Sequence, residues 1–89
     1  MEKNMNITRL ENSKGKRYYY YNDKAILLFD GEFLGDAPWG YCKDYKFGHI
    51  LQYEGEYLNG LRNGKGKEYD SNRKIIYEGE YLNGLRKNH

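Results

Sequence analysis

The sequence predicts an all-β fold in which antiparallel hairpins meander side by side and form one elongated sheet. The ten residues YEGEYLNGLR occur at positions 53–62 and again at 77–86, and the 89-residue chain contains 11 Tyr and 11 Gly. Aromatic rings and glycine suit strands and tight turns. A helix is disfavoured because glycine recurs too densely for an apolar stripe at helical spacing. A chain of this length is expected to form one small domain.

The duplicated stretch belongs to a longer internal repeat with an offset of 24 residues. FDGEFL from position 29 aligns without a gap with YEGEYL from positions 53 and 77. The glycines of the three segments align with one another. The alignment extends before each segment to the equivalent tyrosines Tyr21, Tyr45 and Tyr69. Self-similarity at a fixed period indicates stacked structural units that bury their apolar faces against one another.

Alternation within one unit assigns its side chains to two faces of a strand. Tyr53, Gly55 and Tyr57 share one face, and Glu54 and Glu56 share the other. We expect the glutamates to pair across strands with Lys and Arg. The glycine is expected to leave room for a ring of the neighbouring unit, and each ring pair between units adds about 0.5–1.5 kcal/mol.

Each unit is predicted to be a two-stranded hairpin. Asn59-Gly60 readily takes positive φ and starts the hairpin turn. Residues 64–69 form the returning strand, residues 70–72 the next turn, and residues 73–76 lead into the unit that starts at 77. Residues 18–28 are interpreted as the returning half of an eroded earlier unit. Residues 1–17 match the repeat poorly and are either a disordered leader or an N-terminal cap.

Residues 53–69 resemble the MORN (membrane occupation and recognition nexus) repeat, whose motif is roughly Y-E-G-x-x-x-x-G-x-x-x-G-x-G. The unit at 77 follows this motif through Gly84, whereas the unit at 29 carries Asp36 and Cys42 in place of two of the glycines. The repeat domain is therefore predicted to span residues 18–89, with units starting at 29, 53 and 77 and the last one truncated. The residues that meet the motif in the unit at 53 are Tyr53, Glu54, Gly55, Gly60, Gly64 and Gly66.

The resemblance implies a grooved sheet of hairpins that serves as a binding or scaffolding module. Its implied partners are proteins or peptides, phospholipid head groups, or the remainder of a larger enzyme that it regulates. We expect no catalytic residue, cofactor or metal, because Cys42 is the only cysteine and His49 and His89 have no partner at catalytic spacing. The net charge of +2 is too small to indicate nucleic acid.

Two sets of residues are candidates for binding. A protein or peptide is expected to engage the aromatic face, with Trp39 in a turn as its anchor; this set comprises Phe29, Phe33, Trp39, Tyr53, Tyr57, Tyr77 and Tyr81. The alternative is attachment to anionic phospholipid through basic residues near the turns, each contributing about 1 kcal/mol at a membrane surface. That second set comprises Arg62, Lys65, Lys67, Arg86 and Lys87.

Two further features predict contacts with other molecules. Alternation sends two rings of the run Tyr18–Tyr21 to each face, so at least two should join the aromatic stack and two remain candidates for an exposed patch. Residues 77–82 lack a complete returning strand and are expected to form an unpaired edge that binds a partner strand or another copy. With no secretory signal and no membrane-length apolar run, a cytoplasmic location is expected, with a peripheral position at a membrane or the cytoskeleton as the alternative.

Overall fold

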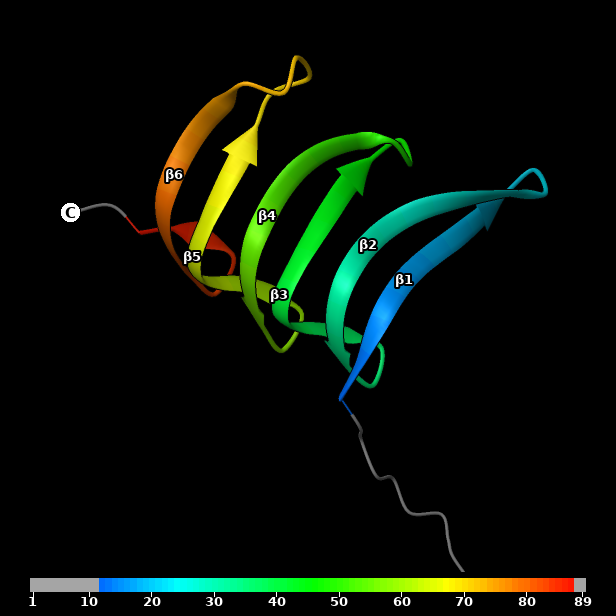
Figure 1. Cartoon of the computed structure of the whole chain (residues 1–89), viewed down its shortest axis with the longest axis horizontal. Coiled ribbons are helices and arrows are strands. Elements are labelled where there is room, and N and C mark those ends of the chain that lie inside the picture. The colour runs from blue at the N-terminus through cyan, green and yellow to red at the C-terminus, as the bar shows by residue number, and fades with distance from the viewer. Residues whose placement is uncertain (1–11, 88–89) are drawn as a thin grey trace, which may run out of the picture.

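The computed structural model describes residues 12–87, which form one open antiparallel sheet of seven strands in chain order (Figure 1). The predicted fold class is confirmed. Successive strands are hydrogen-bonded neighbours throughout, so every connection is a hairpin. The strands are β1 (Asn12–Tyr21), β2 (Lys24–Leu34), β3 (Ala37–Lys46), β4 (Ile50–Leu58), β5 (Leu61–Tyr69), β6 (Ile75–Leu82) and β7 (Leu85–Arg86).

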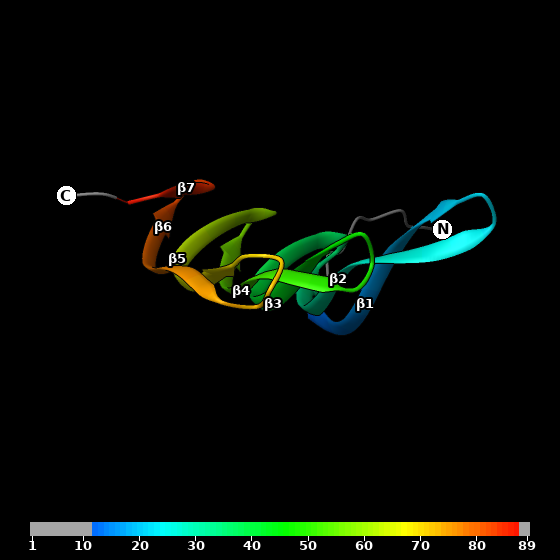
Figure 2. The same ribbon diagram turned by 90° about the horizontal axis from the view of Figure 1, so that it is seen from above.

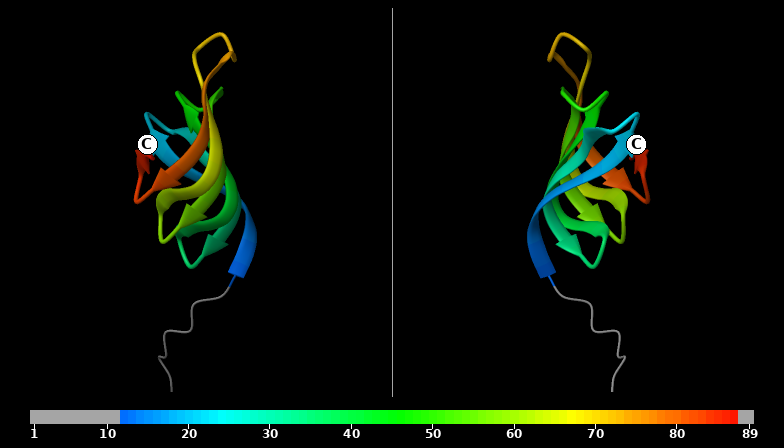
Figure 3. Two further views of the ribbon diagram at one scale, coloured as in Figure 1. Left: turned by 90° about the vertical axis from the view of Figure 1, so that its left-hand side faces the viewer. Right: turned by 90° about the vertical axis from the view of Figure 1, so that its right-hand side faces the viewer.

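The sheet is elongated and thin, with principal extents of 54 × 38 × 16 Å. Strands β1 and β7 lie at its opposite ends (Figure 2). The two end-on views show that the strands are strongly curved and that each hairpin is rotated relative to the one before it (Figure 3). Within residues 12–87 the most extensive contacts join strands that follow each other in the chain, as expected of a repeat array.

The hairpin turns of the repeat units occur where the sequence predicts them. Asn59 and Gly60 adopt φ values of 53° and 84°, and Asn83 and Gly84 adopt 51° and 91°. Positive φ at both central residues gives a turn whose twist matches that of the flanking strands. The Gly60 amide also donates a hydrogen bond of 3.0 Å to the Pro38 carbonyl, so the turn is tied to the preceding hairpin.

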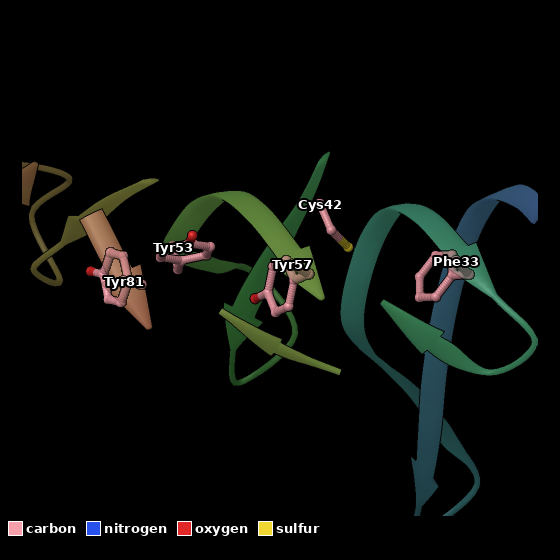
Figure 4. Close-up of a cluster of buried hydrophobic side chains, with 5 residues drawn as sticks. All are labelled: Phe33, Cys42, Tyr53, Tyr57 and Tyr81. Carbon is pink, nitrogen blue, oxygen red and sulfur yellow. The ribbon is translucent and has the colours of Figure 1, made fainter. Parts of the chain in front are cut away.

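The core is a continuous row of six aromatic rings, which we call the aromatic ladder (Figure 4 shows four of them). Every neighbouring pair packs edge to face, at interplanar angles of 77–90°. The Phe29–Tyr57 and Tyr53–Tyr81 contacts, with centroids 6.0 and 5.1 Å apart, join successive units and confirm the predicted stacking between them. In spatial order the ladder is Phe33, Phe29, Tyr57, Tyr53, Tyr81 and Tyr77.

One row of residues runs across six strands at right angles to them, and we call it the glycine row. A Cβ built on Gly55 would lie only 2.5 Å from Gly66 Cα, and one built on Gly66 would overlap the ring of Tyr53. The predicted role of these glycines is therefore corrected, because they make room for the paired backbone and for a ring of their own hairpin. The row consists of Gly15, Gly31, Cys42, Gly55, Gly66 and Gly79.

The two ends of the repeat differ from the sequence-based expectation. Strand β1 begins at Asn12, so the sheet starts before residue 18, where the repeat domain was expected to begin. Gly15 pairs with Gly31 in the register of the repeat. Residues 1–11 lie outside the described part of the chain. All four rings of the run Tyr18–Tyr21 are exposed, by 45–74%, so the prediction that two of them join the stack is wrong. The edge of β6 is covered in part, because β7 pairs with Tyr81 and Leu82.

Candidate functional site

The aromatic ladder supplies the core of the molecule and little of its surface. Phe33 and Tyr53 are fully buried, Tyr57 and Tyr81 are at most 5% exposed, and only Phe29 and Tyr77 are half-buried. Neighbouring units cover most of the ladder, while Phe29 and Tyr57 line part of a hollow of about 320 Å³. A partner-binding role for the rings stays a prediction.

Arginine side chains complete this cover. The guanidinium carbon of Arg17 lies 3.9 Å from the ring centroid of Phe33, and that of Arg62 lies 4.3 Å from the centroid of Tyr53. Arg86 lies over Tyr77 at 4.8 Å. A cation over the face of a ring is attracted by the ring quadrupole, so these arginines stabilise the ladder as well as shielding it.

A buried polar cluster accompanies the ladder in the second unit. The Tyr57 hydroxyl donates to Asp44, a carboxylate that is only 6% exposed, and Arg62 Nη2 lies 3.2 Å from Asp44 Oδ2. Burial raises the pKa of Tyr57 above its ordinary value, and the adjacent Asp44 charge raises it further. The cluster thus satisfies a carboxylate that would otherwise be buried without a partner.

The third unit repeats the cluster with residues 24 positions further on. The Tyr81 hydroxyl donates to Glu68 Oε1 at 2.6 Å, and Arg86 Nε donates to the same oxygen at 2.8 Å. The hydrogen bond from Arg86 lowers the pKa of Glu68 below its ordinary value. We call each set of three a tyrosine–acid–arginine triad.

The first unit lacks the triad at all three positions. Phe33 has no hydroxyl, and Tyr20 and Pro38 stand where the other units have the acid and the arginine. Because the three groups are lost together, the chain itself indicates that they act as one structural set. The sequence analysis did not predict the triads. The signal that identifies them in the sequence is the offset of 24 residues between the members of the two triads.

The opposite side of the sheet, which we call the charged face, carries the glutamates of the repeat. Glu54 lies between Lys43 and Lys67 in the strand register, yet its carboxylate accepts hydrogen bonds from the hydroxyls of Tyr41 at 2.5 Å and Tyr69 at 2.8 Å. Glu54 therefore lies opposite basic residues as expected, and its hydrogen bonds go in addition to two tyrosine hydroxyls that the sequence did not predict. The hydrogen bond from Tyr41 lowers the pKa of Glu54, and the same bond raises the pKa of Tyr41 to about 12.

The second glutamate of each unit holds the backbone of the following strand. Glu56 Oε1 accepts a hydrogen bond of 2.9 Å from the Lys65 amide, next to Gly64 with its φ of 101°. Glu32 accepts one of 3.1 Å from the Tyr41 amide in the first unit, next to Gly40. The glutamate thereby fixes the irregular backbone beside the bulge at each of these two hairpins.

A groove with a volume of about 480 Å³ crosses strands β3 to β6 on the charged face. Its floor is the backbone of Gly55, Gly66 and Gly79, three neighbours in the glycine row. Its walls are side chains of both charges and one exposed ring, namely Tyr41, Glu54, Lys65, Lys67, Glu78 and Glu80. We call this feature the charged-face groove.

The five basic residues of the phospholipid hypothesis do not form a common surface. Arg62 and Arg86 lie over rings of the ladder and are bound to acids of the triads. Lys65 and Lys67 line the charged-face groove on the other side of the sheet. Lys87 Nζ lies 3.6 Å from a Glu80 oxygen, so each of the five has a carboxylate beside or directly across from it.

Trp39 lies in strand β3 and not in a turn, which corrects its predicted position. It is 36% exposed and lines a hollow of about 570 Å³ near the start of β1, together with Lys14, Glu32 and Phe33. Its ring remains available to a partner.

The described residues contain little that suggests a catalytic or metal-binding site. No three His, Cys, Asp or Glu side chains within residues 12–87 are grouped so that they could hold a metal ion. Burial raises the pKa of the Cys42 thiol to about 11, so it is poorly suited to act as a nucleophile. His49 is on the surface of a turn, where Nδ1 lies 2.9 Å from the Phe47 carbonyl; His89 lies outside the described part. No helix in this part of the chain is long and apolar enough to cross a membrane.

Comparison with protein families decides how the repeat is classified. The family model for the MORN repeat matches residues 29–43, 53–73 and 77–89. The chain belongs to the MORN repeat family. The three matched segments begin at the aromatic residues that start the three units, whereas β1 and the first half of β2 precede the match. Comparisons with curated proteins and with solved structures found no match.

The MORN repeat family suggests a binding or scaffold module, and its repeats are generally non-catalytic. The geometry agrees with this general role, since the rings and triads described above serve the integrity of the sheet. The concave surfaces among the described residues include the charged-face groove, the hollow beside Trp39 and the hollow lined by Phe29 and Tyr57.

Proposed function

We propose that this MORN-repeat chain is a non-catalytic binding module that holds an extended protein segment in the charged-face groove. The observation that carries the proposal is the alternation of charge around Lys67, which lies between Glu54 and Glu78 in the strand register. Lys65 likewise lies opposite Glu80. The walls of the groove therefore present charges of both signs at close spacing.

A wall of mixed charge suits a polypeptide better than an anionic membrane. Opposite charges on neighbouring strands cancel at a distance, so the groove does not attract a uniformly negative surface. A polypeptide offers side chains of either sign and backbone groups that can hydrogen-bond to the walls. The ring of Tyr41, which is 47% exposed, adds an aromatic anchor at one end of the groove.

The dimensions of the groove limit the segment that it can hold. Adjacent strands are about 4.8 Å apart, so the three intervals from β3 to β6 span about 14 Å. An extended chain covers that distance with about four or five residues. We therefore expect a short motif with acidic residues placed against lysine, basic residues placed against glutamate, and an apolar residue over Tyr41.

Selection from a displayed peptide library, followed by fluorescence anisotropy, tests the proposal. Tyr41→Ala and Lys67→Glu are expected to weaken binding of the selected peptides about tenfold or more, because each removes a central contact. The matched controls are Tyr20→Ala and Lys24→Glu, which change exposed residues at the far end of the first hairpin and should leave affinity unchanged.

Two results would count against a peptide-binding groove. One is a set of selected peptides whose affinity does not change in the Tyr41 and Lys67 variants. The other is binding to vesicles of phosphatidylcholine and phosphatidylserine that falls with salt and is lost in Lys67→Glu, since that outcome supports the phospholipid alternative.

A further inference from the structure

The two outer strands of the sheet have unpaired edges within the described part of the chain. Strand β1 pairs only with β2. Strand β6 pairs with β5 along its length, but with β7 only at Tyr81 and Leu82. The Lys87 amide donates one more hydrogen bond to the Glu80 carbonyl. Among the described residues, none pairs with the outer edge of β6 from Ile75 to Gly79.

The pose of Tyr77 specifies what kind of strand can pair with this edge. Its hydroxyl donates to the Glu80 carbonyl at 2.9 Å, just as the hydroxyl of Tyr53 donates to the Glu56 carbonyl at 3.0 Å. The Tyr53 ring lies over Gly66 of the next strand, where any Cβ would overlap it. By the same geometry, a strand that pairs with the outer edge of β6 needs glycine opposite Gly79.

Strand β1 offers such a glycine on its open edge. Gly15 occupies the glycine row between Lys14 and Lys16, as Gly66 does between Lys65 and Lys67. Among residues 12–87 no ring requires the space at Gly15, because the one described atom within 4 Å of a Cβ there would be Arg17 Nη1, at 3.9 Å. The open edge that needs a glycine and the open edge that provides one lie at opposite ends of the same sheet.

We propose that copies of this chain associate head to tail, with the outer edge of β6 pairing antiparallel with β1 of the next copy and Gly79 opposite Gly15. This register places Glu78 opposite Lys16, as Glu54 is opposite Lys67 within the chain. The Glu80 end of the edge stays with Lys87 of the same copy, whose amide donates to the Glu80 carbonyl and whose Nζ lies 3.6 Å from the Glu80 carboxylate. The new interface thus repeats the β4–β5 pairing, and the sheet continues from copy to copy.

Charge disfavours the two symmetric alternatives. If two β6 edges paired with Gly79 opposite Gly79, Glu78 of each copy would face Glu80 of the other. If two β1 edges paired through Gly15, Lys14 would face Lys16. Like charges directly opposite each other destabilise a strand pair. Only the pairing of β6 with β1 brings opposite charges together, and because it uses two different surfaces it produces open chains instead of closed dimers.

Cysteine cross-linking of the full chain tests this arrangement. Lys16→Cys and Glu78→Cys are prepared separately, mixed and oxidised; native Cys42 is buried and should not react. We expect a covalent dimer in the mixture and none in either variant alone. Lys43→Cys mixed with Glu78→Cys is the control, because Lys43 faces the same side from the central strand β3 and should not form a dimer.

The outcomes separate the arrangements. A dimer of Glu78→Cys alone would show a symmetric edge contact and would overturn the proposal. A mixture that gives no more dimer than the Lys43→Cys control would also overturn it.

Light scattering over a range of concentrations gives an independent readout. The wild-type mass is expected to rise with concentration beyond that of a dimer. Lys16→Gln is expected to weaken association about fivefold by removing an exposed ion pair, whereas Lys43→Gln should have no effect. A constant monomer mass at all concentrations, or equal effects of the two variants, would contradict head-to-tail pairing.

Discussion

Replacing Gly66 with alanine tests the packing of rings against the glycine row. The added methyl group would overlap the Tyr53 ring, so the ring must move. Movement would break the Tyr53 hydroxyl bond to the Glu56 carbonyl, worth about 1 kcal/mol. It would also disturb the contacts with Tyr57 and Tyr81, each worth about 0.5–1.5 kcal/mol.

We therefore expect Gly66→Ala to lower the free energy of unfolding by about 1–3 kcal/mol, after allowing for the gain of up to about 1 kcal/mol when alanine replaces glycine in a strand. For a domain of this size that corresponds to a melting temperature lower by roughly 5–20 °C. Urea denaturation followed by near-ultraviolet circular dichroism measures the loss. Gly79→Ala is the matched control and should cost less, because its Cβ would approach the Tyr77 hydroxyl only to 2.7 Å.

A double-mutant cycle with Tyr53→Phe identifies the cause. The first unit already combines a ring without a hydroxyl, Phe29, with a residue that has a Cβ, Cys42, at the positions of Tyr53 and Gly66. Gly66→Ala should therefore cost at least about 1 kcal/mol less in the Tyr53→Phe background. Equal cost in both backgrounds, or a Gly66→Ala variant within about 0.5 kcal/mol of wild type, would refute the reasoning.

Further predictions concern the two triads and the buried thiol. Arg62→Leu should lower the free energy of unfolding by about 2–3 kcal/mol in urea, because it leaves the Asp44 carboxylate buried without its cation; a loss below about 0.5 kcal/mol would argue against the triad. The lowered pKa of Glu68 means that the unfolded chain binds its proton first as pH falls, so the stability that Glu68 contributes at neutral pH is lost in acid. Acid titrations monitored by circular dichroism should show a shallower loss for Glu68→Gln than for wild type, and identical slopes would contradict this. The Cys42 thiol should react with iodoacetamide at neutral pH only after denaturation, and rapid labelling of the native protein would show that it is not buried.

The sequence predicts the hairpin architecture well because its signals are local or strictly periodic. Asn59-Gly60 defines a two-residue turn by its own conformational preference, and the offset of 24 residues transfers that turn to Asn83-Gly84. The ring contacts between units follow from the same periodicity. The start of β1 at Asn12 was missed, since the single match of Gly15 to the glycine row is too weak a signal without coordinates.

The binding surface could not be predicted in the same way, because burial depends on contacts between units. Alternation gives the face on which Tyr53 lies, but does not show that Arg62 and the ring of Tyr81 cover it. The partners of Glu54 were predicted only in part. Its opposite residues in the register are lysines, and only the three-dimensional structure shows the hydroxyls of Tyr41 and Tyr69 reaching its carboxylate.

The central claim is that the rings of one hairpin pack against those of the next. Nuclear Overhauser effects between assigned aromatic protons of the labelled full chain test this most directly. The ladder predicts cross-peaks between Phe29 and Tyr57 and between Tyr53 and Tyr81, whose centroids are 6.0 and 5.1 Å apart. Cross-peaks confined to rings of the same hairpin, such as Tyr53 with Tyr57, would contradict the claim.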